Sequence, residues 1–295
     1  MQRWPAFVLA VMLVFACSQA PRATTHPPAR TSSAETTAKP LFRFAAYGDT
    51  RDQHPIHREI VKAVMTFQPA LVLQTGDLVH HGDSADEWKI FDEITGEMRK
   101  QIPFYPARGN HDIGGFFEAR VTQPVLSGTK LYYSFEKENV HFVAIDTEQD
   151  LGPKTKQGDW LEADLAKAQA DGKFIIPFFH KAIYSVGFHA TDSDVVALRP
   201  ILRALFKKHG VRLVFEGHDH IYYRTVRSGI TYIVTGGGGA PFHPNENLKL
   251  MTPGDVYERA NHFCVADVFA DRMKVTVYRR DMTQLDQVSV AMGGK

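Results

Sequence analysis

Five short apolar segments, each followed by polar residues that can bind metal ions, are the feature that most constrains the fold of this chain. In four of the five, a glycine precedes the polar residue and lets the backbone turn sharply off a strand. Because the carboxyl ends of strands form the ligand crevice of open α/β sheets, we expect these side chains to meet at one rim. They are Asp49, Asp77, Asn110 with His111, His180, and His218 with His220.

The chain alternates between helix and strand patterns. Apolar residues recur at helical spacing over residues 57–67, 86–99, 159–170 and 195–208. Short apolar runs predict strands over 41–47, 70–74, 104–107, 132–135, 140–145, 174–179 and 211–215. Beyond residue 221 mostly strands are expected, over 232–234, 263–269 and 273–278, with a weaker one near residue 288. This order of elements predicts an α/β sandwich.

Composition narrows the possible functions. Hydrophobic residues make up 44% and charged residues 23%, which excludes a fibrous or wholly disordered chain. Because 34 basic residues nearly balance 33 acidic ones, no basic excess indicates a surface for nucleic acid. Two cysteines exclude a disulfide scaffold and a thiolate zinc cluster, whereas 14 histidines offer many metal ligands.

The residue types at the predicted rim favour metal chemistry. Carboxylate, amide and imidazole donors together suit first-row metal ions. A carboxylate shared by two ions about 3.5–4 Å apart is the arrangement used for in-line phosphoryl displacement. A metallopeptidase is disfavoured, because the sequence contains no His-Glu-x-x-His helix.

From about residue 41 to the C-terminus, the ordered motifs resemble the calcineurin-like metallophosphoesterases, and most closely the purple acid phosphatase-like branch. The superfamily motifs are Gly48-Asp49, Gly76-Asp77-Leu78-Val79, Gly109-Asn110-His111-Asp112, His180 and Gly217-His218-Asp219-His220. The branch is indicated by residues 217–224 and by the glycine run 236–239 with Ala240-Pro241. The resemblance implies a four-layer α-β-β-α sandwich, with two central mixed sheets flanked by helices.

The resemblance also implies roles for these residues. It implies two divalent or mixed-valence metal ions, such as iron, zinc or manganese. Asp77 would bridge both ions, with Asp49 and His220 on the first. Asn110, His180 and His218 would hold the second. His111 would act beside the leaving-group oxygen as a proton donor or charge stabiliser, and Asp112 could orient it.

Two positions depart from the family pattern. Arg51 stands where many members have a ligand histidine two residues after the first aspartate, and it cannot bind a metal. It could instead grip a phosphate oxygen, or it could be a salt-bridged loop residue. His80 stands where purple acid phosphatases have a ligand tyrosine, so it could fill the vacant coordination site or be a surface histidine.

Other candidates carry weaker signals. His189 lies in a loop where it could touch substrate, although an exposed histidine is an equal alternative. Residues 236–239 lack the Lys-Ser/Thr of a nucleotide P-loop, so we expect a glycine turn near the rim. Cys264 is expected to be a buried free thiol. Tyr222 and Arg224 could act near the site or simply pack within a strand.

The first forty residues are expected to form a separate unit. The apolar run Ala6–Ala16 suits a signal-peptide core, and with Cys17 after it the segment resembles a bacterial lipobox. This implies a signal peptide over 1–16, a lipidated tether over 17–40 and the catalytic domain over 41–295. The alternative is an ordinary signal peptide cut near Ala20. Lipidation implies an extracytoplasmic lipoprotein, anchored only through its lipid, on the periplasmic face or outer membrane of a Gram-negative host.

The sequence therefore predicts a metallophosphoesterase, a phosphoric ester hydrolase in which a metal-bound hydroxide attacks phosphorus in line while His111 assists. The alternative is a non-catalytic metal- or ligand-binding lipoprotein on the same fold, for which the replacement by Arg51 is the only sequence argument. The substrate stays open, because specificity lies in loops such as 113–130 and 185–194. The oligomeric state stays open as well.

Overall fold

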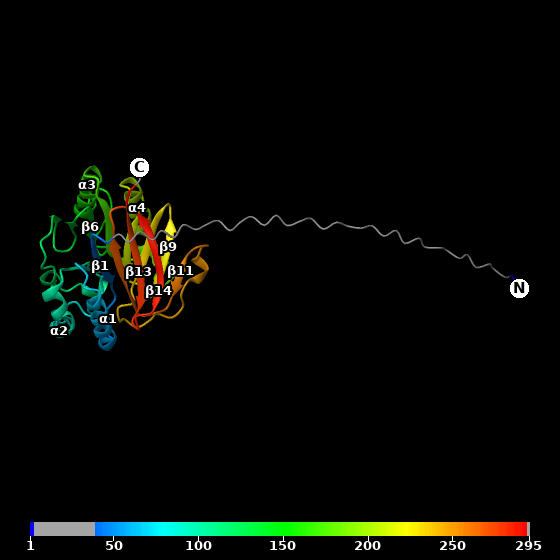
Figure 1. The fold of residues 1–295 in the computed structure, drawn as a ribbon, viewed down its shortest axis with the longest axis horizontal. Coiled ribbons are helices and arrows are strands. Elements are labelled where there is room, and N and C mark those ends of the chain that lie inside the picture. The colour runs from blue at the N-terminus through cyan, green and yellow to red at the C-terminus, as the bar shows by residue number, and fades with distance from the viewer. Residues whose placement is uncertain (3–38, 294–295) are drawn as a thin grey trace. The chain divides into compact units, whose positions relative to one another are not determined.

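The computed structural model describes residues 1–2 and 39–293 (Figure 1). The expected signal peptide, Cys17 and nearly all of the expected tether lie outside the described residues. Among the described residues, no helix has the length and apolar character needed to cross a bilayer.

Two mixed sheets form the centre of the domain. The first has the strand order β14-β13-β12-β1-β2-β3, in which β1, β2 and β3 are parallel. Its strands are β1 (Phe42–Tyr47), β2 (Val72–Gln74), β3 (Phe104–Pro106), β12 (His262–Val268), β13 (Arg272–Arg279) and β14 (Gln284–Ala291). The second has the order β11-β9-β10-β8-β7-β6-β5-β4, with β6, β7, β8 and β10 parallel. Its strands are β4 (Ser127–Gly128), β5 (Tyr133–Lys137), β6 (Val140–Ile145), β7 (Phe174–Lys181), β8 (Leu213–Gly217), β9 (Tyr222–Arg227), β10 (Ile230–Thr235) and β11 (Val256–Glu258).

In the described part of the chain, four α-helices cover the sheets, and α1 lies beside α2 (Figure 1). They are α1 (His54–Thr66), α2 (Ala85–Gln101), α3 (Lys156–Ala170) and α4 (Ser193–Lys208). Ser84 and Thr155 cap α2 and α3 by accepting hydrogen bonds from the free amide groups of the first turn. Short 3-10 turns lie at Asn110–Asp112, Phe117–Arg120 and Leu248–Leu250.

Apolar contacts confirm the expected four-layer sandwich. Between the sheets, the Phe44 ring meets the edges of Phe142 and Phe215, with centroid distances of 5.4 and 5.8 Å. The core that contains these rings also takes in the buried faces of α1 and α2. A separate core joins Leu165 of α3 and Phe206 of α4 to the second sheet. Each fully buried side chain of this size contributes about 1.5–3 kcal/mol.

The expected elements are confirmed, with differences at their ends. Helix α1 begins at His54 rather than at residue 57, because Pro55 suits the first helical turn. The final strand, expected to be weak, pairs along most of its length with β13. Strands β4 and β11 were not expected, because they are short and lack the buried apolar run that marks β2 and β3.

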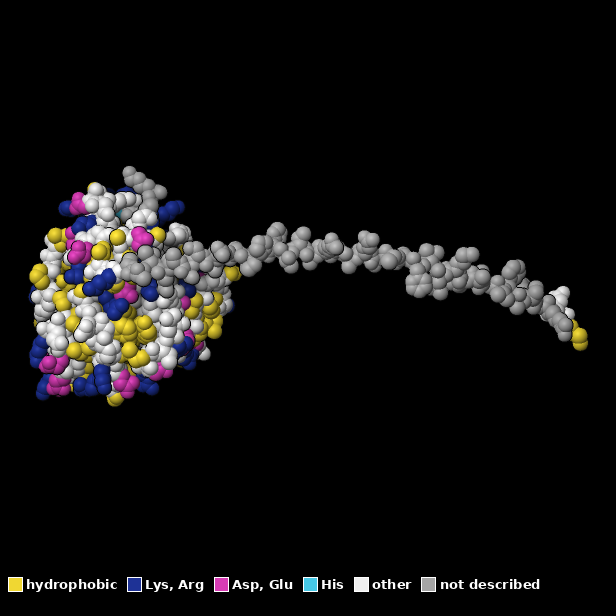
Figure 2. Space-filling model, in the orientation of Figure 1, with side chains coloured by type: hydrophobic (Ala, Val, Ile, Leu, Met, Phe, Trp, Pro, Cys, Tyr) yellow, Lys and Arg dark blue, Asp and Glu magenta, His cyan; other side chains and the backbone are white. Residues whose placement is uncertain are grey.

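The sheets meet where the predicted metal ligands lie. Gly48 follows β1, and its amide donates to the carbonyl of Thr235 at the end of β10. A Cβ atom on Gly217, at the end of β8, would lie 2.7 Å from Oδ2 of Asp49. The ends of β1 and β8 therefore approach so closely that only glycine fits. On the face of the domain shown in Figure 2, basic and acidic side chains are interspersed.

Candidate metal centre

Asp49 and Asp77 are fully buried carboxylates held in an unusual backbone conformation. Their φ angles are 58° and 55°, in the left-handed region that few residues other than glycine adopt. The amide of Asp49 donates to the carbonyl of Gly76, and the amide of Thr50 donates to that of Asp77. A Cβ on Gly109 would lie 2.2 Å from Oδ1 of Asp77. The surrounding backbone thus holds both strained residues in place, as is common at functional sites.

His180 brings four potential metal donors together. Its Nδ1 donates to the carbonyl of Thr75 at 3.0 Å, so its Nε2 carries the lone pair. That Nε2 lies 3.2 Å from Oδ1 of Asp77 and 3.0 Å from Oδ1 of Asn110. Nδ1 of His218 lies 3.1 Å from the same Nε2. The lone pair on Nε2 of His180 therefore faces oxygen acceptors of Asp77 and Asn110, which is an arrangement that a bound cation stabilises.

His220 and Asp49 form a second donor group of the same kind. Nδ1 of His220 donates to the carbonyl of Pro241, which leaves the lone pair on Nε2. This Nε2 lies 3.5 Å from Oδ1 of Asp49. Metal-binding histidines usually donate their other N–H to a carbonyl or carboxylate, as His180 and His220 both do.

The charges at the site also fit bound cations. Burial and the charge of Asp77 raise the pKa of Asp49 well above its usual range. Burial lowers the pKa of His220 to about 3 and that of His218 well below its usual value. The two imidazoles are therefore neutral at pH 7, as metal ligands must be. Positive charge between Asp49 and Asp77 would relieve their repulsion, so the donor set fits metal ions.

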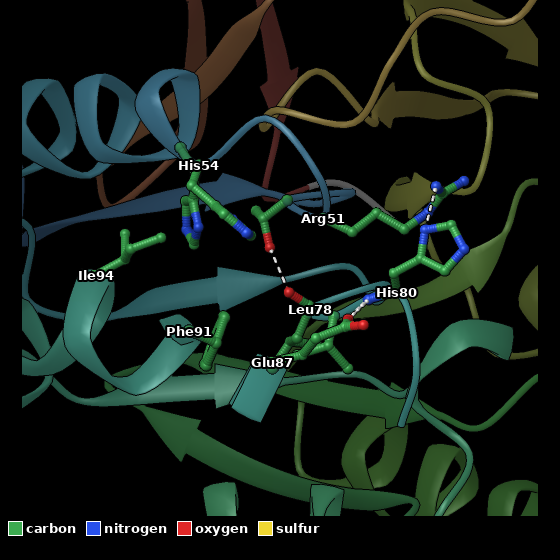
Figure 3. Close-up of a pocket in the computed structure, with 10 residues that line it drawn as sticks. Arg51, His54, Leu78, His80, Glu87, Phe91 and Ile94 are labelled. Atoms are coloured by element: carbon green, nitrogen blue, oxygen red, sulfur yellow. Dashed lines mark hydrogen bonds between the residues drawn. The ribbon is translucent and has the colours of Figure 1, made fainter. Parts of the chain in front are cut away.

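Arg51 and His80 lie side by side at the edge of this group (Figure 3). Nε of Arg51 is 3.5 Å from Oδ2 of Asp77 and has no hydrogen-bond partner, while Nη1 bonds Asp52 at 2.6 Å. Nδ1 of His80 also bonds Asp52, at 2.8 Å. Arg51 is therefore salt-bridged and yet faces the site. His80 does not join the close group formed by Asp49, Asp77 and His180.

His111 lies beside Asp77, but Asp112 does not orient its ring. Nδ1 of His111 donates to the carbonyl of His80 at 2.8 Å, and its Nε2 is 3.9 Å from Oδ2 of Asp77. The buried Asp112 carboxylate instead accepts from four backbone amides, those of Asp77, Leu78, Val79 and Gly109. The expectation that Asp112 orients His111 is therefore corrected. Asp112 joins the loop after β2 to the loop after β3, and the carbonyl of His80 orients the His111 ring.

Two further histidines, His189 and His243, lie beside the site. His243 belongs to no sequence motif. The ring of His189 stacks on His218 with a centroid distance of 4.0 Å, and its Nδ1 bonds Asp192. The ring of His243 lies 4.2 Å from His220 and 4.9 Å from His189. In sequence, His243 follows the glycine run by four residues, and nothing else marks it. Its place depends on a loop that only the fold brings back to the site.

Other candidates prove to be structural. Tyr222 and Arg224 on β9 both bond Asp286 on β14, so they join the two sheets rather than act at the site. The expected glycine turn near the rim is confirmed, because a Cβ on Gly236 would lie 2.9 Å from Oδ2 of Asp49. Cys264 is a buried free thiol, as expected.

Comparisons with known proteins agree with this geometry. The family model described as calcineurin-like phosphoesterase matches residues 42–222. Purple acid phosphatase 18 of Arabidopsis thaliana is 30% identical over 194 residues, which cover 58% of this chain and 44% of the relative. Tartrate-resistant acid phosphatase type 5 of Mus musculus is 25% identical over 248 residues, covering 69% of this chain and 74% of the relative. The chain thus spans about half or less of the plant relatives it matches.

Solved structures share the fold. Purple acid phosphatase PPD1 from yellow lupin superposes with a TM-score of 0.70 at 19% identity, over 86% of this chain and 54% of that chain. GAP50, the anchor in the inner membrane complex of Plasmodium, superposes with a TM-score of 0.69 at 19% identity, over 87% and 90%.

Proposed function

Because the chain belongs to the calcineurin-like phosphoesterase family, we propose that it hydrolyses phosphoesters at the centre built around Asp49 and Asp77. The observation that carries the proposal is the convergence of lone pairs. Nε2 of His180 faces the oxygens of Asp77 and Asn110, and no hydrogen bond can form between two acceptors. A cation bound between these atoms would remove the repulsion between their lone pairs.

The residues present would hold two metal ions, divalent or mixed-valence, such as iron, zinc or manganese. Asp77 would serve both ions. Asp49 and His220 would hold one, and Asn110, His180 and His218 the other. When bound, such ions neutralise phosphate charge and lower the pKa of water.

The protein itself supplies a proton carrier and a cation for the phosphoryl group. Because Nδ1 of His111 is committed to the His80 carbonyl, Nε2 is the atom that holds or releases a proton beside the leaving group. This Nε2 lies 3.9 Å from Oδ2 of Asp77. Arg51 is mostly buried, and its unpartnered Nε suits it to hold a phosphate oxygen.

Replacement of Asp77 tests this proposal. Asp77→Ala and His218→Ala should each abolish hydrolysis of 4-nitrophenyl phosphate and lower the metal content of the purified protein. Asp271→Ala, which changes a well-exposed aspartate, is the matched control and should alter neither quantity. Full activity in metal-free Asp77→Ala would overturn the mechanism.

The same measurements address a non-catalytic role. A wild-type protein that binds metal in stoichiometric amount but turns over no phosphoester would favour a binding protein on this fold. The nearly complete donor set argues for catalysis, since the departures from the family pattern are confined to Arg51 and His80.

We also propose that the mature protein is anchored outside the cytoplasm through a lipid on Cys17. Support comes from the apolar run Ala6–Ala16 directly before this cysteine. In cells fed an alkyne fatty acid, the full chain should take up label and sediment with membranes. Cys17→Ala should lose the label, and a label retained by this variant would contradict the proposal.

A further inference from the structure

Aromatic rings continue outward from the metal centre to an exposed phenylalanine. The His243 ring lies 4.2 Å from that of His220, at an angle of 36°. Phe188 stacks on His243 at 5.3 Å and 11°. His189 stands nearly perpendicular to both, at 88° to Phe188 and 82° to His243. The three rings of Phe188, His189 and His243, here called the aromatic wall, lie against His218 and His220 of the metal-ligand group.

The two loops that carry the aromatic wall are fastened to each other and to the site. Asn247 donates from its backbone amide to the carbonyl of Val186 and from its side chain to that of Gly187. A Cβ atom on Gly187 would lie 2.1 Å from Cγ of Asp219, so this loop lies directly against the metal-ligand segment. The position of Phe188 is therefore set in advance, which lowers the entropy lost on binding a ligand.

Phe188 is exposed, so packing in the hydrophobic core does not account for its position. The residue is 43% exposed, against 38% for Phe116 and 37% for Phe242. Phe116 instead lines a hollow with Trp88, and Phe242 lines one with Arg259. Of the exposed phenylalanines in the described part of the chain, Phe188 alone stacks on histidines of the site.

We propose that the aromatic wall binds the organic group of the substrate, and that the substrate class is phosphoesters of planar aromatic groups. The inference rests on the proposed function. A phosphoryl group held at the donor group lies next to His189 and His243, so its ester substituent can extend along Phe188. Planar rings gain from offset or edge-on stacking on such side chains, whereas a small alkyl group does not. The hydrogen bond between His189 and Asp192 makes the wall polar and therefore unsuited to an acyl chain.

Binding of phosphonates to the metal-loaded protein tests the wall without turnover. Phenylphosphonate and methylphosphonate share a headgroup and differ only in the substituent. Stacking of about 0.5–1.5 kcal/mol predicts that the wild-type protein binds phenylphosphonate roughly 2- to 13-fold tighter by calorimetry. Phe188→Ala should bring this ratio close to one, and Phe188→Tyr should preserve it. Phe116→Ala, a matched change of an exposed phenylalanine away from the histidines, should leave the ratio unchanged.

Hydrolysis separates this inference from the proposed function. The ratio of kcat/KM for 4-nitrophenyl phosphate to that for glycerol 2-phosphate should fall in Phe188→Ala and persist in Phe116→Ala. Turnover of both esters with a ratio that Phe188→Ala does not change would overturn the aromatic wall alone. A wild-type protein that prefers phenylphosphonate but hydrolyses neither ester would overturn the hydrolase and support the wall as a ligand site.

Discussion

Nε of Arg51 lies 3.5 Å from Oδ2 of Asp77, so a guanidinium faces the carboxylate that we assign to both metal ions. Arg51 places a fixed positive charge at this point of the site. Asp52 holds the Nη1 side of the guanidinium at 2.6 Å. Arg51 is therefore oriented before any substrate arrives.

This geometry predicts that Arg51→Gln weakens phosphate binding. Loss of a charge-assisted hydrogen bond worth about 1.5–3 kcal/mol should raise the inhibition constant of inorganic phosphate roughly 10- to 150-fold. Arg51→Lys keeps the charge but loses the planar guanidinium group, so its inhibition constant should lie between those of the wild type and Arg51→Gln. Metal content should stay at the wild-type level. Unchanged phosphate inhibition together with a lower metal content would show that Arg51 only positions Asp77 and does not bind phosphate.

His111→Gln should slow turnover while leaving metal content intact, because its ring is not among the assigned ligands. General acid catalysis typically contributes 10²–10⁴-fold, and kcat for an alkyl ester should drop by about that factor. The drop should be smaller for 4-nitrophenyl phosphate, whose leaving group needs no proton. An equal loss for both esters would argue against a proton on Nε2.

Asp112→Ala should destabilise the fold itself. Four backbone amides lose their acceptor, among them those of Asp77 and Gly109. A buried group left without a partner costs about 1–3 kcal/mol, so the free energy of unfolding should fall by roughly 3 kcal/mol or more. Urea unfolding of the metal-free protein measures this. Asp112→Asn keeps one acceptor oxygen and should lose less; wild-type stability in Asp112→Ala would contradict the structural role.

His57 should make stability depend on pH. Burial lowers its pKa to about 3, with smaller contributions from His54 and Arg58, and its Nε2 has no partner. Below the unfolded value of about 6.5 the unfolded chain binds a proton that the folded state refuses, so stability is full above that pH and falls as pH drops towards 3. Between pH 7 and pH 4.5 the loss should be about 2.5 kcal/mol.

Replacing the ring isolates this effect. In His57→Phe, the difference in unfolding free energy between pH 7 and pH 4.5 should shrink by that amount, because the new ring packs between Tyr47 and Phe91 without a titrating group. His54→Gln, a change of a half-buried histidine on the same helix, is the control. A pH dependence equal to that of wild type in His57→Phe would refute the assignment.

Much of the donor group could be predicted because its residues end parallel strands. Asp49, Asp77 and His180 each follow an apolar run, and parallel strands bring their carboxyl ends to one edge. The family resemblance assigned the same residues, and the match over residues 42–222 confirms the family. Phe188 and His243 could not be placed in this way, because loops carry them and no periodic pattern specifies how two loops meet.

The sequence by itself determined the alternation of helices and strands and the polar residues that follow the strands, because hydrophobic periodicity and glycine-led turns are local properties. The four layers were implied only by the family resemblance. Only the tertiary structure decided which nitrogen of each imidazole is free. That choice depends on carbonyl groups distant in sequence: Thr75 for His180 and Pro241 for His220. Likewise, Asp112 accepts hydrogen bonds from the backbone amides of residues 77–79 only because folding brings that segment next to it. Hydrogen bonds between such distant segments form only once the sheets have packed.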